Sequence, residues 1–285
     1  MKTSGFTIAA AQMRFRPTPE ENAAEVCGQI AAAAARGADA ILFPECALTG
    51  YNIDVRTVSR TELDAALASV AAAAATHRCH VLVGTPTRQR NRWFNSLLVL
   101  DRKGREQFRY HKIHLTPRDA QVFTPGNSIA FFTLNGVPCT AILCHERRYP
   151  ELVRLPVMLG AQVVFHPNAG LDSLAVSRTK RRGRDGIAIR AFENQVFYVF
   201  ANSVGPQGGG LWSAGDSKIV APDSSVLAVA NNRDPALLVA RLNLQEAGRK
   251  YAREALLAPK FLRPHWRAML DACRRELAHQ AKERD

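Results

Sequence analysis

The sequence predicts an α/β fold in which mixed strands and helices form one layered domain. Strand-like and helix-like segments alternate along most of the 285 residues, and no low-complexity linker divides them. Two alanine runs fall inside helix-like segments, where alanine has the best helix propensity. The chain is 47% hydrophobic, so it can bury a large core.

The first half of the chain is expected to contain two helices and several strands. Pro19 and Gly37 are start and stop signals around the first helix. Lys103-Gly104 and Asn135-Gly136 each indicate a hairpin between the flanking strands. In order, we expect a strand at Phe6–Gln12, a helix at Glu20–Arg36, a strand at Ala40–Phe43, a helix at Thr61–His77, and strands at Val81–Thr85, Asn95–Asp101, Gln107–Tyr110, Ile129–Leu134 and Thr140–Leu143.

The second half repeats this alternation. Pro156 is expected to end or kink the helix that contains it, because proline removes a backbone donor. In order, we expect a helix at Glu151–Leu159, a strand at Gln162–Phe165, a helix at Ile187–Asn194, a strand at Val196–Asn202, antiparallel strands around Ile219, Val226–Ala230 and Leu237–Leu242, and an amphipathic helix or tail at Phe261–Asp285.

The composition excludes several classes of protein. The net charge is +13, with basic clusters at Arg88–Arg92, Arg178–Arg184 and from Lys250 onward. No aromatic residues interleave with the first two clusters and no nucleic-acid-binding motif is present, so a solvated surface is favoured over nucleic-acid binding. The six cysteines form no close CxxC pair, so neither a zinc site nor a disulfide framework is indicated. No apolar run reaches membrane-spanning length and no signal peptide is visible, so we expect a cytoplasmic protein.

The segment TAILCHERRYPELVR places Cys144 where an apolar strand turns abruptly polar. A thiolate is the reactive form of cysteine, and nearby cations or a helix start lower its pKa. A catalytic nucleophile and a small core residue are about equally consistent with this segment alone.

Two further segments place reactive groups beside turns. In ILFPECALTGY, Glu45 follows a strand ended by Pro44 and lies among apolar residues, where desolvation would raise its pKa and suit a general base. In FRYHKIHLTP, Lys112 lies just beyond a strand, where it could stabilise an oxyanion. A surface carboxylate and a snorkelling lysine are the alternatives. With Cys144 these residues form a coherent hydrolytic set, in which the His145 N–H would also hold the oxyanion.

These motifs, in this order, resemble the nitrilase superfamily of carbon–nitrogen hydrolases. The resemblance also includes FTPG after the lysine segment, RAFENQVFYVFANSVG and GDSKIVAPDSSVLA, and covers about residues 6–241. It implies a four-layer αββα sandwich, a Glu45–Lys112–Cys144 triad, a thioester intermediate, and no metal or organic cofactor. It also implies a homodimer or higher homo-oligomer. We expect a hydrolase domain at 1–245 and a C-terminal extension, mainly helical, at 246–285.

Some positions depart from the family pattern. Asp119 stands where relatives often have a second glutamate, and a helix cap is its alternative role. We expect Tyr51, Asp119, His145 and Asn168 to contact the substrate. Arg148 and Glu151 match motif residues that we expect to form a structural ion pair. The basic segment 180–186 replaces a tryptophan region, and either an anionic substrate or a solvated loop would explain it.

The expected activity is hydrolysis of a linear amide or N-carbamoyl amine, with release of ammonia. A nitrile is a less favoured substrate, because nitrilases typically carry a tryptophan after the cysteine and this chain has His145. A catalytically silent scaffold is the alternative from another functional class. The expected partner is a small molecule, with neither nucleic acid nor membrane.

Overall fold

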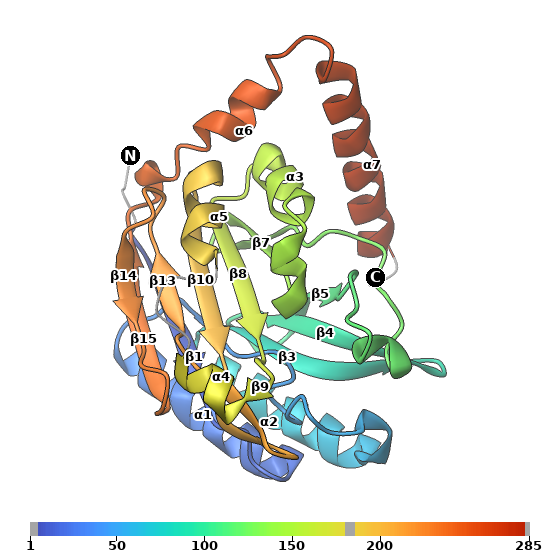
Figure 1. Cartoon of the computed structure of the whole chain (residues 1–285), viewed down its shortest axis with the longest axis vertical. Coiled ribbons are helices and arrows are strands. Elements are labelled where there is room, and N and C mark those ends of the chain that lie inside the picture. The colour runs from blue at the N-terminus through green and yellow to red at the C-terminus, as the bar shows by residue number, and fades with distance from the viewer. Residues whose placement is uncertain (1–4, 180–185, 283–285) are drawn as a thin grey trace.

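The computed structural model describes residues 5–179 and 186–282, so most of the basic segment discussed above lies outside the described residues. Two six-stranded sheets pack face to face, and helices cover the outer face of each (Figure 1). This arrangement is the expected four-layer αββα sandwich.

The first sheet has the strand order β15-β1-β2-β3-β4-β5. The neighbours β1, β2 and β3 are parallel, and the remaining pairs are antiparallel. Thr18 and Glu21 form a capping box at the start of the first helix, which explains why that helix begins there. The elements are β1 (Phe6–Gln12), α1 (Pro19–Ala35), β2 (Ala40–Leu42), α2 (Arg60–His77), β3 (His80–Gln89), β4 (Arg92–Leu100), β5 (Glu106–His111) and β15 (Ala236–Leu242).

The second sheet has the order β14-β13-β10-β8-β7-β6. A small third sheet, with the order β11-β12-β9, is formed by strands from the same part of the sequence. The parallel strands β7, β8 and β10 are apolar along most of their length because both faces are covered. The elements are β6 (Phe132–Leu134), β7 (Val137–Ala141), α3 (Glu151–Leu159), β8 (Val163–Asn168), β9 (Asp172–Ser173), α4 (Leu174–Thr179), α5 (Ile187–Asn194), β10 (Phe197–Asn202), β11 (Val204–Gly208), β12 (Leu211–Ala214), β13 (Lys218–Val220) and β14 (Val226–Val229).

The core between the sheets is built from alternate residues of both. Leu42 and Leu97 from the first sheet meet Phe132, Phe165 and Val199 from the second, and all five are buried. There are two further cores, one between each sheet and the helices that cover its outer face. The sandwich therefore holds the ends of strands from two sheets in fixed positions relative to one another.

One of the two outcomes expected of Pro156, an end to its helix, is wrong. Pro156 neither ends nor interrupts α3, which continues to Leu159. Proline inside a helix costs about 3 kcal/mol, but Leu152, Val153 and Val157 are buried against the second sheet. Each such burial contributes roughly 1.5–3 kcal/mol, so packing outweighs the local penalty. β15 is an antiparallel strand, as expected, and its partner is β1 of the other sheet.

The C-terminal segment contains α6 (Lys250–Ala255) and α7 (Arg263–Lys282), which form the two sides of an arch at the top of Figure 1. Along α7, Leu270 is the buried residue, and the helix contacts α3. Within the described ranges, no helix is both long and apolar enough to cross a membrane.

Candidate active site

Glu45 lies in the turn that follows β2, and its side chain is completely buried. The turn crosses β3 at Gly84, where a Cβ atom would come within 2.3 Å of the Pro44 carbonyl oxygen and 2.8 Å of the Glu45 Cα. Only glycine permits this approach without displacing the turn. The glycine in the neighbouring strand therefore helps to place the glutamate.

Lys112 follows β5 and is also completely buried, with two carboxylates around its ammonium group. Its Nζ lies 2.7 Å from Glu45 Oε1 and 2.8 Å from Asp119 Oδ2. Burial alone would lower the pKa of Lys112, but the negative charge of Glu45 and the other acidic groups nearby raises it well above its usual value. The lysine is therefore a fixed, fully charged cation within the site.

The two carboxylate oxygens of Glu45 have different surroundings. Oε1 accepts hydrogen bonds from Lys112 Nζ and from Asn95 Nδ2, the latter at 2.7 Å. Oε2 is buried and has no partner among the described residues. Burial raises the pKa of Glu45, while Lys112 and Asn95 oppose that rise. Oε2 is thus the oxygen available to accept a proton.

Asp119 is held on both sides. Its Oδ2 accepts from Lys112 Nζ and from the Thr116 N–H, and its Oδ1 accepts from the Tyr51 hydroxyl at 2.8 Å. Burial would raise the pKa of Asp119, but Lys112 and these hydrogen bonds lower it. The structure thus brings Asp119 to Lys112. Asp119 also has the alternative role of a cap, because it exchanges backbone-to-side-chain hydrogen bonds with Thr116.

Cys144 begins a 3₁₀ turn (Cys144–Arg148) between β7 and α3, so it does not lie directly at the start of an α-helix. Its φ is +46°, a left-handed conformation that costs a non-glycine residue roughly 1–2 kcal/mol. Burial and then the charge of Glu45 raise the pKa of Cys144 to about 12, although Lys112, a hydrogen bond from the Ala169 backbone and Arg147 lower it. The nearby cations therefore lower this pKa as expected, but desolvation raises it by more, so the net shift is upward.

Glu146 connects the cysteine turn to the lysine segment. Its buried carboxylate accepts from the N–H groups of Leu143, Ile113 and His114 and from the Tyr110 hydroxyl. Leu143 precedes the cysteine, and Ile113 follows the lysine. The carboxylate therefore fixes the two segments relative to each other, and burial raises its pKa to about 7.

A pocket of about 300 Å³ opens at Cys144. Tyr51, His145 and Asn168, all expected to contact the substrate, line it; Asp119 lies behind Tyr51. Arg147 and Arg148 also line it. The sequence predicted an ion pair between Arg148 and Glu151, but no such pair forms among the described side chains. Three arginines therefore surround the pocket: Arg118, Arg147 and Arg148.

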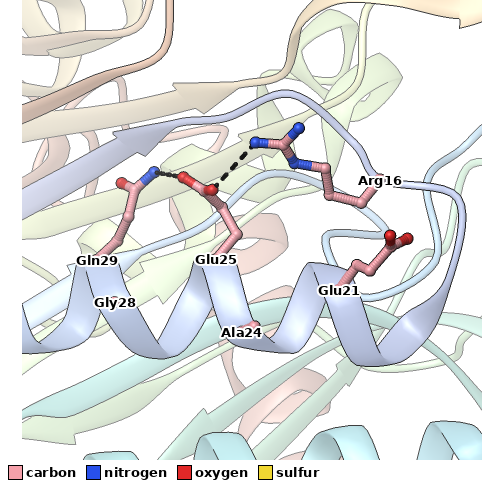
Figure 2. A pocket seen from close by; sticks show the side chains of 6 residues that line it. All are labelled: Arg16, Glu21, Ala24, Glu25, Gly28 and Gln29. Carbon is pink, nitrogen blue, oxygen red and sulfur yellow. Dashed lines mark hydrogen bonds and ion pairs between the residues drawn. The ribbon is translucent and has the colours of Figure 1, made fainter.

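Larger hollows lie elsewhere on the molecule. One of about 500 Å³ runs along the outer surface of α1, where Glu25 contacts Arg16 and Gln29 (Figure 2). None of its lining residues is a nucleophile or belongs to the buried cluster around Lys112. The chemistry of the lining, and not its size, identifies the pocket at Cys144 as the candidate active site.

Sequence reasoning missed the positioning roles of Asn95 and Glu146. Asn95 is in an alternating strand and could not be distinguished there from a solvent-facing residue. The sequence did contain a sign of the role of Glu146, because an acidic residue lies within the turn that carries the cysteine. Buried positions rarely hold acidic residues. The partners of Glu146 come from a segment about 30 residues earlier in the chain.

Comparison with known proteins agrees with this geometry. The carbon–nitrogen hydrolase family matches residues 7–251. An (R)-stereoselective amidase from a Pseudomonas species is 31% identical over 211 residues, which are 73% of this chain and 74% of that protein. The 2-oxoglutaramate amidase of Bacillus subtilis is 27% identical over 218 residues, 74% of this chain and 80% of that one.

Solved structures show the same relationship. The crystal structure of an amidase from Nesterenkonia sp. has a TM-score of 0.75 at 26% identity, covering 89% of this chain and 97% of that one. In another structure of that amidase, the active-site cysteine carries the acetamide moiety of fluoroacetamide (TM-score 0.76, 25% identity, 89% and 95% coverage). The matches in sequence and in fold lead to one conclusion: this chain belongs to the carbon–nitrogen hydrolase family of the nitrilase superfamily and is an amidase-like enzyme that acts on non-peptide C–N bonds.

Proposed function

We propose that the protein hydrolyses a primary amide or an N-carbamoyl amine through a thioester on Cys144 and releases ammonia. The observation that carries this proposal is the buried Glu45–Lys112–Asp119 cluster beside a cysteine at the base of a pocket. A base, a cation and a nucleophile in one desolvated site are the three groups that acyl transfer needs.

The first half-reaction begins with a neutral thiol, because the pKa of Cys144 is raised to about 12. Glu45 Oε2 accepts the thiol proton as the sulfur attacks the carbonyl carbon. The Lys112 ammonium group and the His145 backbone N–H stabilise the oxyanion that forms. When the C–N bond breaks, Glu45 returns the proton to the leaving nitrogen, and ammonia departs.

The second half-reaction regenerates the enzyme. Glu45 accepts a proton from water as the water oxygen attacks the thioester carbon. The C–S bond breaks, and the proton on Glu45 returns to the Cys144 sulfur, leaving a carboxylic acid product. An N-carbamoyl amine would yield an amine, ammonia and carbon dioxide in total.

The far end of the substrate, we propose, carries a carboxylate. Arg118, Arg147 and Arg148 line the pocket, and guanidinium groups bind carboxylates in a bidentate geometry. Arg118 donates to the Asn52 side-chain oxygen, so its charge is not neutralised by that contact. Relatives of this chain include the 2-oxoglutaramate amidase and the human omega-amidase NIT2, which is 22% identical over 254 residues.

Ammonia release across a substrate panel tests both parts of the proposal. The panel pairs succinamate with butyramide, which has a methyl group in place of the carboxylate, and adds an N-carbamoyl amino acid and a nitrile. We expect turnover of amide or carbamoyl compounds and a preference for the anionic member. Arg147→Ala should raise KM for succinamate about 10-fold and leave KM for butyramide unchanged, while Arg60→Ala on the exposed side of α2 should change neither. If none of the compounds in the panel released ammonia, the proposed activity would be refuted.

We further propose a homodimer or higher homo-oligomer assembled through the outer helical layer. Large apolar side chains are exposed on α5, on α6 and in the segment before α7: Ile189, Phe192, Tyr251, Leu257 and Phe261. A second copy of this chain would cover them. Residues 246–285 would then be an extension that contributes to the assembly, and sedimentation equilibrium of the full chain against Phe192→Glu tests this.

We also propose a cytoplasmic location. The six cysteines are unpaired, which fits the reducing cytoplasm.

A further inference from the structure

Two buried oxygens beside the nucleophile lack a hydrogen-bond donor among the described residues. They are Glu45 Oε2 and Asn168 Oδ1. Asn168 is 4% exposed. Buried acceptors are almost always paired, because an unpaired one has lost its hydration without replacement. Glu45 Oε2 takes the thiol proton in the proposed mechanism, whereas for Asn168 Oδ1 a donor is to be expected from outside the protein.

The orientation of the Asn168 amide follows from its neighbour Asn202. Asn202 Oδ1 accepts from the Gly170 backbone N–H at 3.1 Å, and Asn202 Nδ2 donates to the Gly215 carbonyl at 2.7 Å. These backbone partners determine which end of the Asn202 amide is oxygen. Asn168 must then present Nδ2 to Asn202 Oδ1, at 2.8 Å. Its Oδ1 is the end left without a donor.

Asn168 is also close to the reacting atoms. It is the last residue of β8 and lines the pocket together with Cys144. The next residue, Ala169, also lines the pocket, and its backbone N–H lowers the pKa of the Cys144 thiol. The unpaired oxygen thus belongs to a residue in the same stretch of the pocket wall as Ala169.

We propose that Asn168 Oδ1 accepts an N–H from the scissile –CO–NH2 group of the substrate, while Glu45 Oε2 faces the other N–H. The inference rests on the proposed function and adds a basis for selectivity. A primary amide or a carbamoyl group supplies two N–H donors for the two vacant acceptors. A nitrile or an ester supplies none, so with either one both oxygens stay buried and unpaired.

Binding to the inactive Cys144→Ala protein tests the proposal without turnover. Isothermal titration gives Kd for succinamate and monomethyl succinate, or for butyramide and methyl butyrate if the wild type prefers a neutral chain. In this background, Asn168→Ala should weaken amide binding roughly 10-fold, equivalent to about 1.4 kcal/mol, and change ester binding by less than about 2-fold. Should that variant not fold, Asn168→Ser replaces it with the same expectation.

Asn194→Ala is the matched control. Asn194 is also buried, and its Oδ1 has no partner among the described residues, but it lies on α5 and not in the pocket lining. It should change neither Kd. An equal loss for amide and ester, or no loss for the amide, overturns this inference while leaving the proposed function intact. A wild-type protein that hydrolyses no primary amide or carbamoyl compound overturns both.

Discussion

Removing Asn95 should shift the pH dependence of catalysis, because this residue stabilises the charged form of the proposed base. Asn95 Nδ2 donates to Glu45 Oε1 at 2.7 Å within a fully buried site. A hydrogen bond to a charged group contributes roughly 1.5–3 kcal/mol, and one pKa unit corresponds to about 1.4 kcal/mol. Asn95→Ala should therefore raise the pKa of Glu45 further, by about 1–2 units.

The sign of the effect follows from the role of Glu45. The base must be ionised to accept the thiol proton, so kcat/KM rises with pH as Glu45 loses its proton. In Asn95→Ala this acidic limb should move about 1–2 units to higher pH. The assay is kcat/KM for one amide substrate between pH 4 and pH 9, with Asn91→Ala, an exposed residue of the same hairpin, as the control. An acidic limb at the wild-type position, with only a lower plateau, would refute the reasoning.

Three more perturbations follow from the site. Cys144→Ala should abolish turnover with an unchanged circular dichroism spectrum, and mass spectrometry of the wild type mixed with substrate should detect an acyl adduct that this variant lacks. The pKa of Glu146 in the folded protein is raised to about 7 from 4.5, so its contribution to stability is present below pH 4.5 and falls by roughly 3 kcal/mol as pH rises to about 7. The difference in urea-unfolding free energy between wild type and Glu146→Gln should therefore change across that pH range. A difference that stays constant with pH would contradict this reasoning. Gly84→Ala should lower kcat at least 10-fold by displacing the Glu45 turn, and steady-state kinetics with a crystal structure of the variant checks this.

The residues that follow strands show how much of the candidate site could be predicted from the sequence. Glu45 and Cys144 each follow an apolar run that ends at a proline or at a sudden polar stretch, and Lys112 follows an alternating strand, so their positions beyond strands were predictable from local patterns. Asp119 and Tyr51 were predicted to contact the substrate, and the structure links them by a hydrogen bond beside Lys112. Their roles in catalysis stay predictions.

Contacts between distant segments were not predictable in this way. Asn95 and Glu45 are 50 positions apart, and no local pattern distinguishes Asn95 from other polar strand residues. Pro156 was misjudged because its local penalty is visible in the sequence and its compensation by packing is not. The pairing of Arg148 with Glu151 was inferred from a motif, and a motif specifies residue types without specifying side-chain directions.

The sequence by itself predicted most of the strands and helices and the three reactive residues, because apolar runs and turn chemistry are local properties. The αββα class followed from the resemblance of the motifs to the nitrilase superfamily. Only the tertiary structure revealed the upward shift of the Cys144 pKa, the oxygens of Glu45 and Asn168 that lack a donor among the described residues, and the carboxylate of Glu146 that joins the cysteine and lysine segments. The physical reason is that desolvation and hydrogen-bond satisfaction depend on every group that packs around a site. Those groups come together only when the two sheets close on each other.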